Sequence, residues 1–218
     1  MAHRPVFVSI NTAPFYKVVE PEFKYYYGFS LSQNRKTISS LHEAFSSLCP
    51  ELNVLEISSK SENDLGVKLS AFNLKTQNCD GLESSVECFY QGGKMFENGG
   101  PYYELINRTS REAKKDPRIY ESGDITGFYL DGKTYTQKNV EPFYSWLYIN
   151  ALRNDRHLSE EVEKYDAFTD IVYSPRQKID TACQARSAAI YVGLKRADLL
   201  DDYVSDIDTF LDKHFAEI

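Results

Sequence analysis

Several features that would assign a function directly are missing from this 218-residue sequence. Neither GxGxxG nor GxxxxGK[ST] occurs, which argues against a doubly wound nucleotide-binding fold. The four cysteines show no CxxC spacing and the four histidines no HExxH spacing, so we predict no metal site and no cofactor. No apolar run approaches the roughly 20 residues that a membrane-spanning helix needs.

The start of the chain, MAHRPVFVSINTAPFYKV, also lacks the uninterrupted apolar run of a signal peptide, so we expect a cytoplasmic protein without a membrane partner. A hydrophobic content of 42% with 14% aromatic residues is typical of a folded chain. With no internal repeat, the length favours one domain over residues 1–218. We expect N-terminal strands and turns over 1–36 and an acidic amphipathic helix over 198–218.

The net charge of -7 is unevenly distributed along the chain. Residues 198–218 carry seven acidic residues against one lysine, which leaves the remaining 197 residues close to neutral. Within that part, RTSREAKKDPR (108–118) holds five basic residues against two acidic ones. An anionic partner is therefore compatible with this segment despite the acidic average. The acidic face of the last helix is either solvated or a surface for a basic partner.

Hydrophobic periodicity predicts helices interleaved with short strands, and hence an α+β fold. VFVSI and LNVLEISS favour strands, LGVKLSAFNL (65–74) an extended or mixed element, and DITGFYLDGKTY (124–135) a hairpin that turns at Asp131 and Gly132. Ser40 and Glu43 have capping-box spacing in the first predicted helix. The predicted helices cover 37–48, 84–97, 109–116, 141–154, 184–196 and 198–215.

The stretch ESSVECFYQGGKMFENGG (83–100) carries the strongest candidate site. At about 100° per residue, a helix places Glu87, Gln91, Lys94 and Asn98 on one narrow stripe. Alternatively, Glu87 closes a capping box with Ser84, and the side chains of Gln91 and Lys94 face solvent. The pair Gly92-Gly93 weighs against that alternative, because two glycines cost a helix about 2 kcal/mol relative to alanine. Such glycines suggest that another backbone or a ligand comes very close.

Three further polar groups have both a structural and a functional interpretation. In TSREAKKDPR, Thr109 and Glu112 have capping-box spacing, while Arg111 and Lys114, one turn apart, suit a diphosphate or a nucleic-acid backbone. Serine and amide side chains near strand ends usually form hydrogen bonds with the backbone groups of turns, and aspartates usually cap the next turn. The same side chains can instead line a binding pocket. The candidates of that second kind are Ser58, Lys60, Asn73, Asp166, Asp170, Gln184 and Arg186.

The order and spacing of these motifs resemble the NADAR family. VECFYQGGKMF is similar to its VExxYQxxK signature, TSREAKKDPR to its SPREAKxxGR motif, and LSAFN to its LSNF segment. Together with LEISSKS, FYSWLYINAL, YDAFTDI and CQARSAA, the likeness spans roughly residues 4–200 and is to the branch paired with DarT-type DNA ADP-ribosyltransferase toxins. The sequence departs from many members in having Cys88 instead of histidine after Glu87, and CQARS in place of a WGxG-like segment.

The resemblance implies a YbiA-like α+β fold and hydrolysis of N-glycosidic bonds. In the toxin-paired branch it implies an antitoxin that removes ADP-ribose from the guanine amino group in DNA, with ADP-ribosylated DNA as substrate, ADP-ribose as product and a toxin as partner. A second enzymatic hypothesis is an N-glycosidase of small phosphoribosylated metabolites. A third is a non-catalytic protein that neutralises a toxin by contact through the acidic C-terminal helix.

Cleavage of such a bond develops positive charge at the anomeric carbon of the ribose, so the site needs a carboxylate there. We expect Glu87 to supply it and Gln91 to position water or a ribose hydroxyl. Lys94 has three open roles: a general acid, a group that holds the carboxylate, or an amine nucleophile. Arg111 and Lys114 are expected to bind the diphosphate. The other expected pocket members are Lys60, Asn73, Asp170, Gln184 and Arg186.

Overall fold

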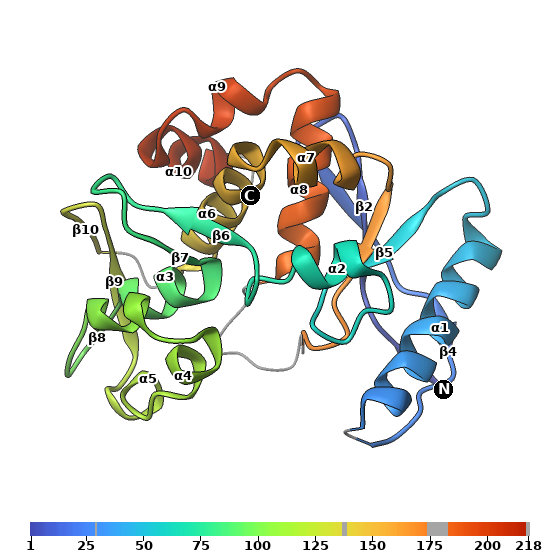
Figure 1. The fold of residues 1–218 in the computed structure, drawn as a ribbon. Coiled ribbons are helices and arrows are strands. Elements are labelled where there is room, and N and C mark those ends of the chain that lie inside the picture. The colour runs from blue at the N-terminus through green and yellow to red at the C-terminus, as the bar shows by residue number, and fades with distance from the viewer. Residues whose placement is uncertain (29, 137–138, 174–182, 217–218) are drawn as a thin grey trace.

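The computed structural model describes residues 1–28, 30–136, 139–173 and 183–216, which form a single α+β domain as predicted (Figure 1). Within these residues, no helix is long and apolar enough to cross a membrane. The strands form several small sheets and not one large sheet, and two central helices pack between these sheets. These helices are α6 (Glu141–Asn154) and α8 (Gln184–Arg196).

The largest sheet has four strands in the order β3-β2-β11-β5. Its strands are β2 (Val6–Ser9), β3 (Tyr16–Val19), β5 (Val54–Glu56) and β11 (Ala167–Thr169). β11 runs antiparallel to β2 and parallel to β5, so β5 and β11 end at the same edge of the sheet. The loops that follow these two strands therefore emerge side by side.

Alternating side chains place this sheet between two layers of helix. Val6 and Val8 face α1 (Leu31–Leu48), where they pack with Leu41 and Phe45. Phe7, on the other face, joins the main core with α8. Figure 1 shows the same order in space, with α1 and α8 on opposite sides of β2 and β5. The short pair β1 (Ala2–His3) and β4 (Glu22–Phe23) lies beside α1.

The middle of the chain builds a second layer around the short helix α3 (Val86–Gly93). A three-stranded sheet in the order β10-β9-β8 and the pair β6-β7 flank it, together with short helices. These elements are β6 (Lys75–Gln77), β7 (Glu83–Ser85), β8 (Lys94–Phe96), η1 (Tyr103–Asn107), α4 (Ser110–Lys115), α5 (Arg118–Glu121), β9 (Ile125–Leu130) and β10 (Lys133–Tyr135). The remaining short helices are α2 (Asp64–Lys68), α7 (Arg156–Val162), α9 (Leu200–Val204) and α10 (Ile207–Ala216).

The predicted hairpin is confirmed: β9 and β10 pair around Asp131 and Gly132, which both have positive φ angles. Several predicted boundaries are wrong. The first helix begins at Leu31, within the segment expected to hold only strands and turns, because Ser30 caps it by accepting a hydrogen bond from the Gln33 N–H. Ser40 therefore lies in mid-helix.

Two more elements differ from the sequence prediction. The segment 65–74 is largely helix α2 and turns, since Asn63 caps that helix through the Leu65 N–H. The acidic C-terminal segment is two helices, α9 and α10, instead of one. As the amphipathic pattern predicted, apolar residues of this segment face the core, and Val204, Phe210 and Leu211 are buried.

Candidate active site

Helix α3 begins one residue later than a Ser84–Glu87 capping box requires. Ser85 is the N-cap and accepts a hydrogen bond from the Cys88 N–H at 3.1 Å. Ser84 instead donates its hydroxyl to the Ile106 carbonyl oxygen at 2.6 Å, on the far side of β7. The capping interpretation of Glu87 is therefore wrong, and its side chain is available for other contacts.

Glu87, Gln91 and Lys94 form a hydrogen-bonded row, although the predicted helix 84–97 is wrong at both ends. Glu87 and Gln91 lie one turn apart on α3, as their helical spacing predicts, whereas Lys94 is the first residue of β8. Gln91 Nε2 donates to Glu87 Oε1 at 2.9 Å, and Lys94 Nζ donates to Gln91 Oε1 at 3.1 Å. All three residues are at most 4% exposed, which rules out solvated surface positions. The Lys94 ammonium also lies 4.1 Å from the centre of the Tyr90 ring, a distance typical of a cation–π contact. A carboxylate, an amide and an ammonium are thus held in one buried row.

The glycine pair marks the close approach of neighbouring protein segments. A Cβ atom on Gly93 would lie 2.7 Å from both Phe128 Cζ and the Tyr129 carbonyl oxygen, so β9 occupies that space. A Cβ atom on Gly92 would lie 3.3 Å from the Tyr102 carbonyl oxygen. The sequence suggested that another backbone or a ligand comes close to the glycine pair. In the structure, the backbone at Tyr129 and Tyr102 comes close. The helix ends at Gly93, because Lys94 is extended and begins β8.

Helix α4 brings a second ammonium to Glu87. Lys114 Nζ lies 3.5 Å from Glu87 Oε1, and the lysine side chain is 48% exposed. The predicted capping box at Thr109 and Glu112 is confirmed and fixes the start of this helix. Ser110, at its first turn, lies within hydrogen-bond distance of Ser85 Oγ and the Phe72 carbonyl oxygen, which ties α4 to α3. Lys114 is therefore the solvent-side neighbour of a buried carboxylate.

Asp170 follows β11 and is a second carboxylate near this group. Its Oδ1 accepts hydrogen bonds from the N–H groups of Val172 and Tyr173 at 3.0 and 3.1 Å. Burial, and secondly the charge of Glu56, raise the pKa of Asp170 to about 7, while the positive charge of Lys114 acts in the opposite direction. A carboxyl group with this pKa exchanges a proton near neutral pH, which suits general acid or base catalysis.

Tyr144, on α6, was not among the residues predicted for this site. It is 4% exposed and its ring meets that of Tyr90 edge-on at 5.0 Å. Burial, followed by the charges of Glu87 and Asp170, raises the pKa of Tyr144 well above its usual value. The hydroxyl therefore lies within electrostatic range of both carboxylates. No sequence signal distinguished this tyrosine from the apolar residues around it.

Glu56, at the end of β5, was also missed. It is 2% exposed and accepts hydrogen bonds from Thr169 Oγ1 at 2.5 Å, Ser58 Oγ at 2.7 Å and the Ile171 N–H at 2.9 Å. Burial raises its pKa, and these hydrogen bonds oppose that shift. Ser58 is fully buried in this arrangement, so its predicted contact with a ligand is replaced by one with Glu56.

The other predicted site residues fall into two groups. Gln184 and Arg186 lie inside the protein: Gln184 donates to the Ile57 carbonyl oxygen and accepts from the Ala71 N–H, both at 2.8 Å, and Arg186 forms a 2.7 Å ion pair with Glu141. They support the loops around the site. The second group lies nearer the surface, where Arg111 and Asn73 are exposed and Lys60 is partly exposed.

A protein-family model matches nearly the whole chain. The model described as the DarT1-associated NADAR antitoxin matches residues 2–217. The chain belongs to this family. No curated protein matches it. NADAR antitoxins are de-ADP-ribosylating hydrolases, so membership implies reversal of ADP-ribosylation by DarT1. The buried row Glu87, Gln91 and Lys94 lies within VECFYQGGKMF, the segment that resembles the VExxYQxxK signature.

Among the described residues, no group of three or more His, Cys, Asp or Glu side chains lies close enough together to hold a metal ion. The candidate site instead gathers two carboxylates, two ammonium groups, an amide and a phenol. These groups can transfer protons and stabilise charge directly.

Proposed function

We propose that this protein hydrolyses the N-glycosidic bond between ADP-ribose and the guanine amino group in DNA, and thereby reverses modification by DarT1. The observation that carries the proposal is the buried hydrogen-bonded row of Glu87, Gln91 and Lys94, with Lys114 at its solvent side. Family membership supports an ADP-ribosyl substrate. The guanine base and the DNA are our extension.

In this mechanism Glu87 faces the anomeric carbon of the ribose. As the carbon–nitrogen bond breaks, positive charge develops on the ribose, and a carboxylate held in place by Gln91 stabilises it. The same carboxylate accepts a proton from the water whose oxygen bonds to the anomeric carbon. Asp170, with a pKa of about 7, donates a proton to the departing guanine amino group. The products are ADP-ribose and the unmodified base.

The remaining polar residues position these groups or bind the rest of the substrate. Lys94 donates to Gln91 and so fixes the amide orientation in which Gln91 donates to Glu87. Of its three roles left open by the sequence, we therefore assign the positioning role. Lys114 and Arg111, on exposed positions of α4, are assigned to the diphosphate together with Lys60. Asn73 lies on the exposed loop between α2 and β6 and is assigned to the ribose.

The proposal is tested on a single-stranded oligonucleotide carrying one ADP-ribosylated guanine, prepared with a DarT1 toxin. Release of free ADP-ribose is measured for the wild type, Glu87→Gln and Glu83→Gln. Glu83 is an exposed neighbour on β7 and provides the matched control. We expect release by the wild type and Glu83→Gln, and a loss of at least about a hundredfold for Glu87→Gln.

Two outcomes would overturn the proposal. Release from a small phosphoribosylated metabolite, without release from the oligonucleotide, would assign the protein to metabolite hydrolysis. Full protection of toxin-expressing cells by Glu87→Gln would show that the protein neutralises the toxin by contact, because the variant lacks the catalytic carboxylate. The unfolding midpoint of the variant checks that it is folded.

A further inference from the structure

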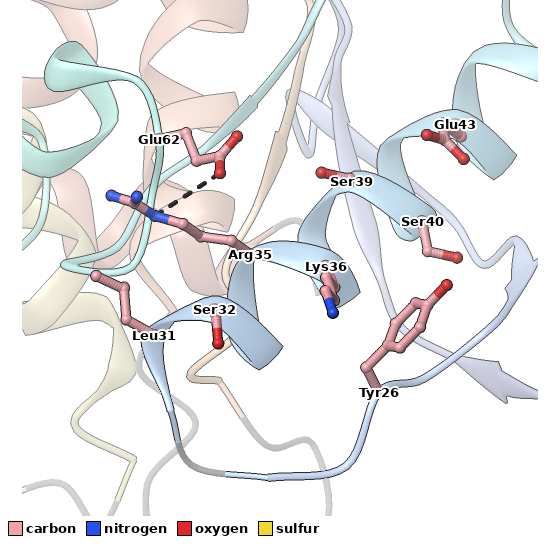
Figure 2. Close-up of a pocket in the computed structure, with 9 residues that line it drawn as sticks. All are labelled: Tyr26, Leu31, Ser32, Arg35, Lys36, Ser39, Ser40, Glu43 and Glu62. Atoms are coloured by element: carbon pink, nitrogen blue, oxygen red, sulfur yellow. Dashed lines mark ion pairs between the residues drawn. The ribbon is translucent and has the colours of Figure 1, made fainter.

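A hollow of about 630 Å³ lies on the outer face of α1 (Figure 2), and no residue of α3 lines it. Six of the residues that line it recur every three or four positions along the helix. They are Ser32, Arg35, Lys36, Ser39, Ser40 and Glu43. They form one stripe opposite the buried stripe of α1, which includes Ile38, Leu41 and Phe45. The hollow is completed by Tyr26, Leu31 and Glu62.

The segment that forms this hollow has an unusual charge for an acidic protein. From Lys24 to His42 the sequence contains Lys24, Arg35 and Lys36 and no acidic residue. Three serines of the stripe add hydroxyl groups that can donate to phosphate oxygens. Glu43 ends the stripe and Glu62 faces Arg35, whose Nε lies 3.8 Å from the glutamate. The positive charge is therefore concentrated in the first half of α1.

Aromatic side chains lie beside these basic residues. Tyr27 is 88% exposed, and its ring meets that of Tyr25 at a centroid distance of 5.3 Å. Lys24 Nζ lies 5.0 Å from the centre of the Tyr26 ring, which faces the hollow. Exposed rings next to basic side chains are the combination that binds single-stranded nucleic acid, because bases stack on the rings while phosphates meet the cations.

The hollow is connected to the candidate active site through the common edge of β5 and β11. Glu62, opposite Arg35, lies on the loop that follows β5, two residues after Lys60. His42 Nε2, on α1, lies 2.9 Å from Thr169 Oγ1, and Thr169 directly precedes Asp170. A single strand of nucleic acid lying along α1 would therefore reach the edge of the sheet from which Asp170 emerges.

We propose that this face of α1, with Tyr25, Tyr26 and Tyr27, is the docking surface for the single-stranded DNA next to the modified guanine. Arg35, Lys36 and the serines bind its phosphates, and the exposed ring of Tyr27 stacks on its bases beside the partly exposed rings of Tyr25 and Tyr26. This inference rests on the proposed function, because it assumes that the ADP-ribosyl group is attached to DNA. It adds a second binding region, outside the ADP-ribose site, that favours modified oligonucleotides over modified nucleosides.

The test compares two substrates that carry the same bond: an ADP-ribosylated oligonucleotide and ADP-ribosylated deoxyguanosine. Lys36→Glu and Tyr27→Ala are measured beside the control variant Lys17→Glu. Lys17 is an exposed lysine on β3, the edge strand at the other end of the sheet from β5. We expect each of the first two variants to raise KM for the oligonucleotide about tenfold. KM and kcat for the nucleoside remain at the wild-type values in all three.

Salt provides a second measurement, since removing a cation that binds a phosphate makes the affinity for DNA less dependent on ionic strength. We expect a shallower salt dependence of KM for Lys36→Glu than for Lys17→Glu. Unchanged oligonucleotide kinetics in Lys36→Glu and Tyr27→Ala would overturn the docking surface, as would weaker binding of the toxin protein without a change in oligonucleotide KM. Failure of the wild type on both substrates would instead overturn the proposed function.

Discussion

Lys114 Nζ lies 3.5 Å from Glu87 Oε1, so a half-exposed lysine on α4 pairs with a carboxylate buried on α3. Because one partner of this pair is accessible, it can be removed without opening the core. Lys114→Met should leave Glu87 without its solvent-side cation and lower kcat/KM for the modified oligonucleotide about tenfold or more. The matched variant Lys115→Met removes an exposed lysine one position further along and should keep wild-type activity. Equal activity of the two variants would exclude Lys114 from the site.

Asp170 predicts the pH dependence of the reaction. Its pKa of about 7 means that the protonated form is lost as the pH rises through neutrality. If Asp170 is the proton donor, kcat should fall above about pH 7, and Asp170→Asn should be slow at every pH without that alkaline decline. The measurement is a pH profile of kcat from pH 5 to 9. A decline that persists in Asp170→Asn belongs to another group.

The same pKa has a consequence for stability. The carboxyl group is more protonated in the folded than in the unfolded protein between its ordinary value of 3.8 and about 7. Folding therefore binds a proton in this window, and the contribution of Asp170 to stability declines as the pH rises through it. Asp170→Asn should unfold at higher urea than the wild type at pH 8 and lose that advantage toward pH 4.

Glu56 joins the two loops at the edge of the main sheet. Glu56→Ala would leave the Ser58 hydroxyl, the Thr169 hydroxyl and the Ile171 N–H without their acceptor, at a cost of about 2–5 kcal/mol in the free energy of unfolding. Glu56→Gln keeps one oxygen, and its amide can donate to Thr169, so its cost should stay near 1 kcal/mol. Urea unfolding compares the two.

The glutamine variant also tests the link to Asp170. The charge of Glu56 raises the pKa of Asp170, so Glu56→Gln should lower that pKa and move the alkaline decline of kcat to lower pH. An unchanged profile in a folded Glu56→Gln protein would show that the two carboxyl groups act independently.

Local signals account for what the sequence predicted of this site. Glu87 and Gln91 share a helix face because they lie one turn apart, and Lys94 follows directly after the helix, close enough to reach Gln91. The hairpin at Asp131 and Gly132 depends on adjacent residues. The capping box failed for an equally local reason. Serines stand at both 84 and 85, β7 extends through Ser85, and the helix begins only at Val86.

The other half of the site depends on contacts that spacing does not encode. Glu56, Tyr144 and Asp170 come from a strand, a helix and a loop that are each separated by tens of residues or more, and no period links them. Tyr144 lies in a helix whose pattern indicates core packing, and most of that helix is indeed buried. Gln184 was expected at the substrate, whereas both ends of its amide bind loop backbone.

Alanine substitutions of Gly92 and Gly93 distinguish the effect of helix propensity on stability from the effect of close packing. Alanine at either position favours the helical backbone by up to about 1 kcal/mol. At Gly93 the added methyl would lie 2.7 Å from the Tyr129 carbonyl oxygen and from Phe128 Cζ, so β9 must move. We expect Gly93→Ala to cost about 1–3 kcal/mol of unfolding free energy and Gly92→Ala, whose nearest neighbour is at 3.3 Å, to stay within about 1 kcal/mol of the wild type.

The same two variants should differ in activity. Because Lys94 directly follows Gly93, displacement of β9 should disturb the hydrogen bond from Lys94 to Gln91 and reduce activity more in Gly93→Ala than in Gly92→Ala. Equal stability and activity of the two variants in urea unfolding and ADP-ribose release would show that the approach of β9 does not hold the buried row in place.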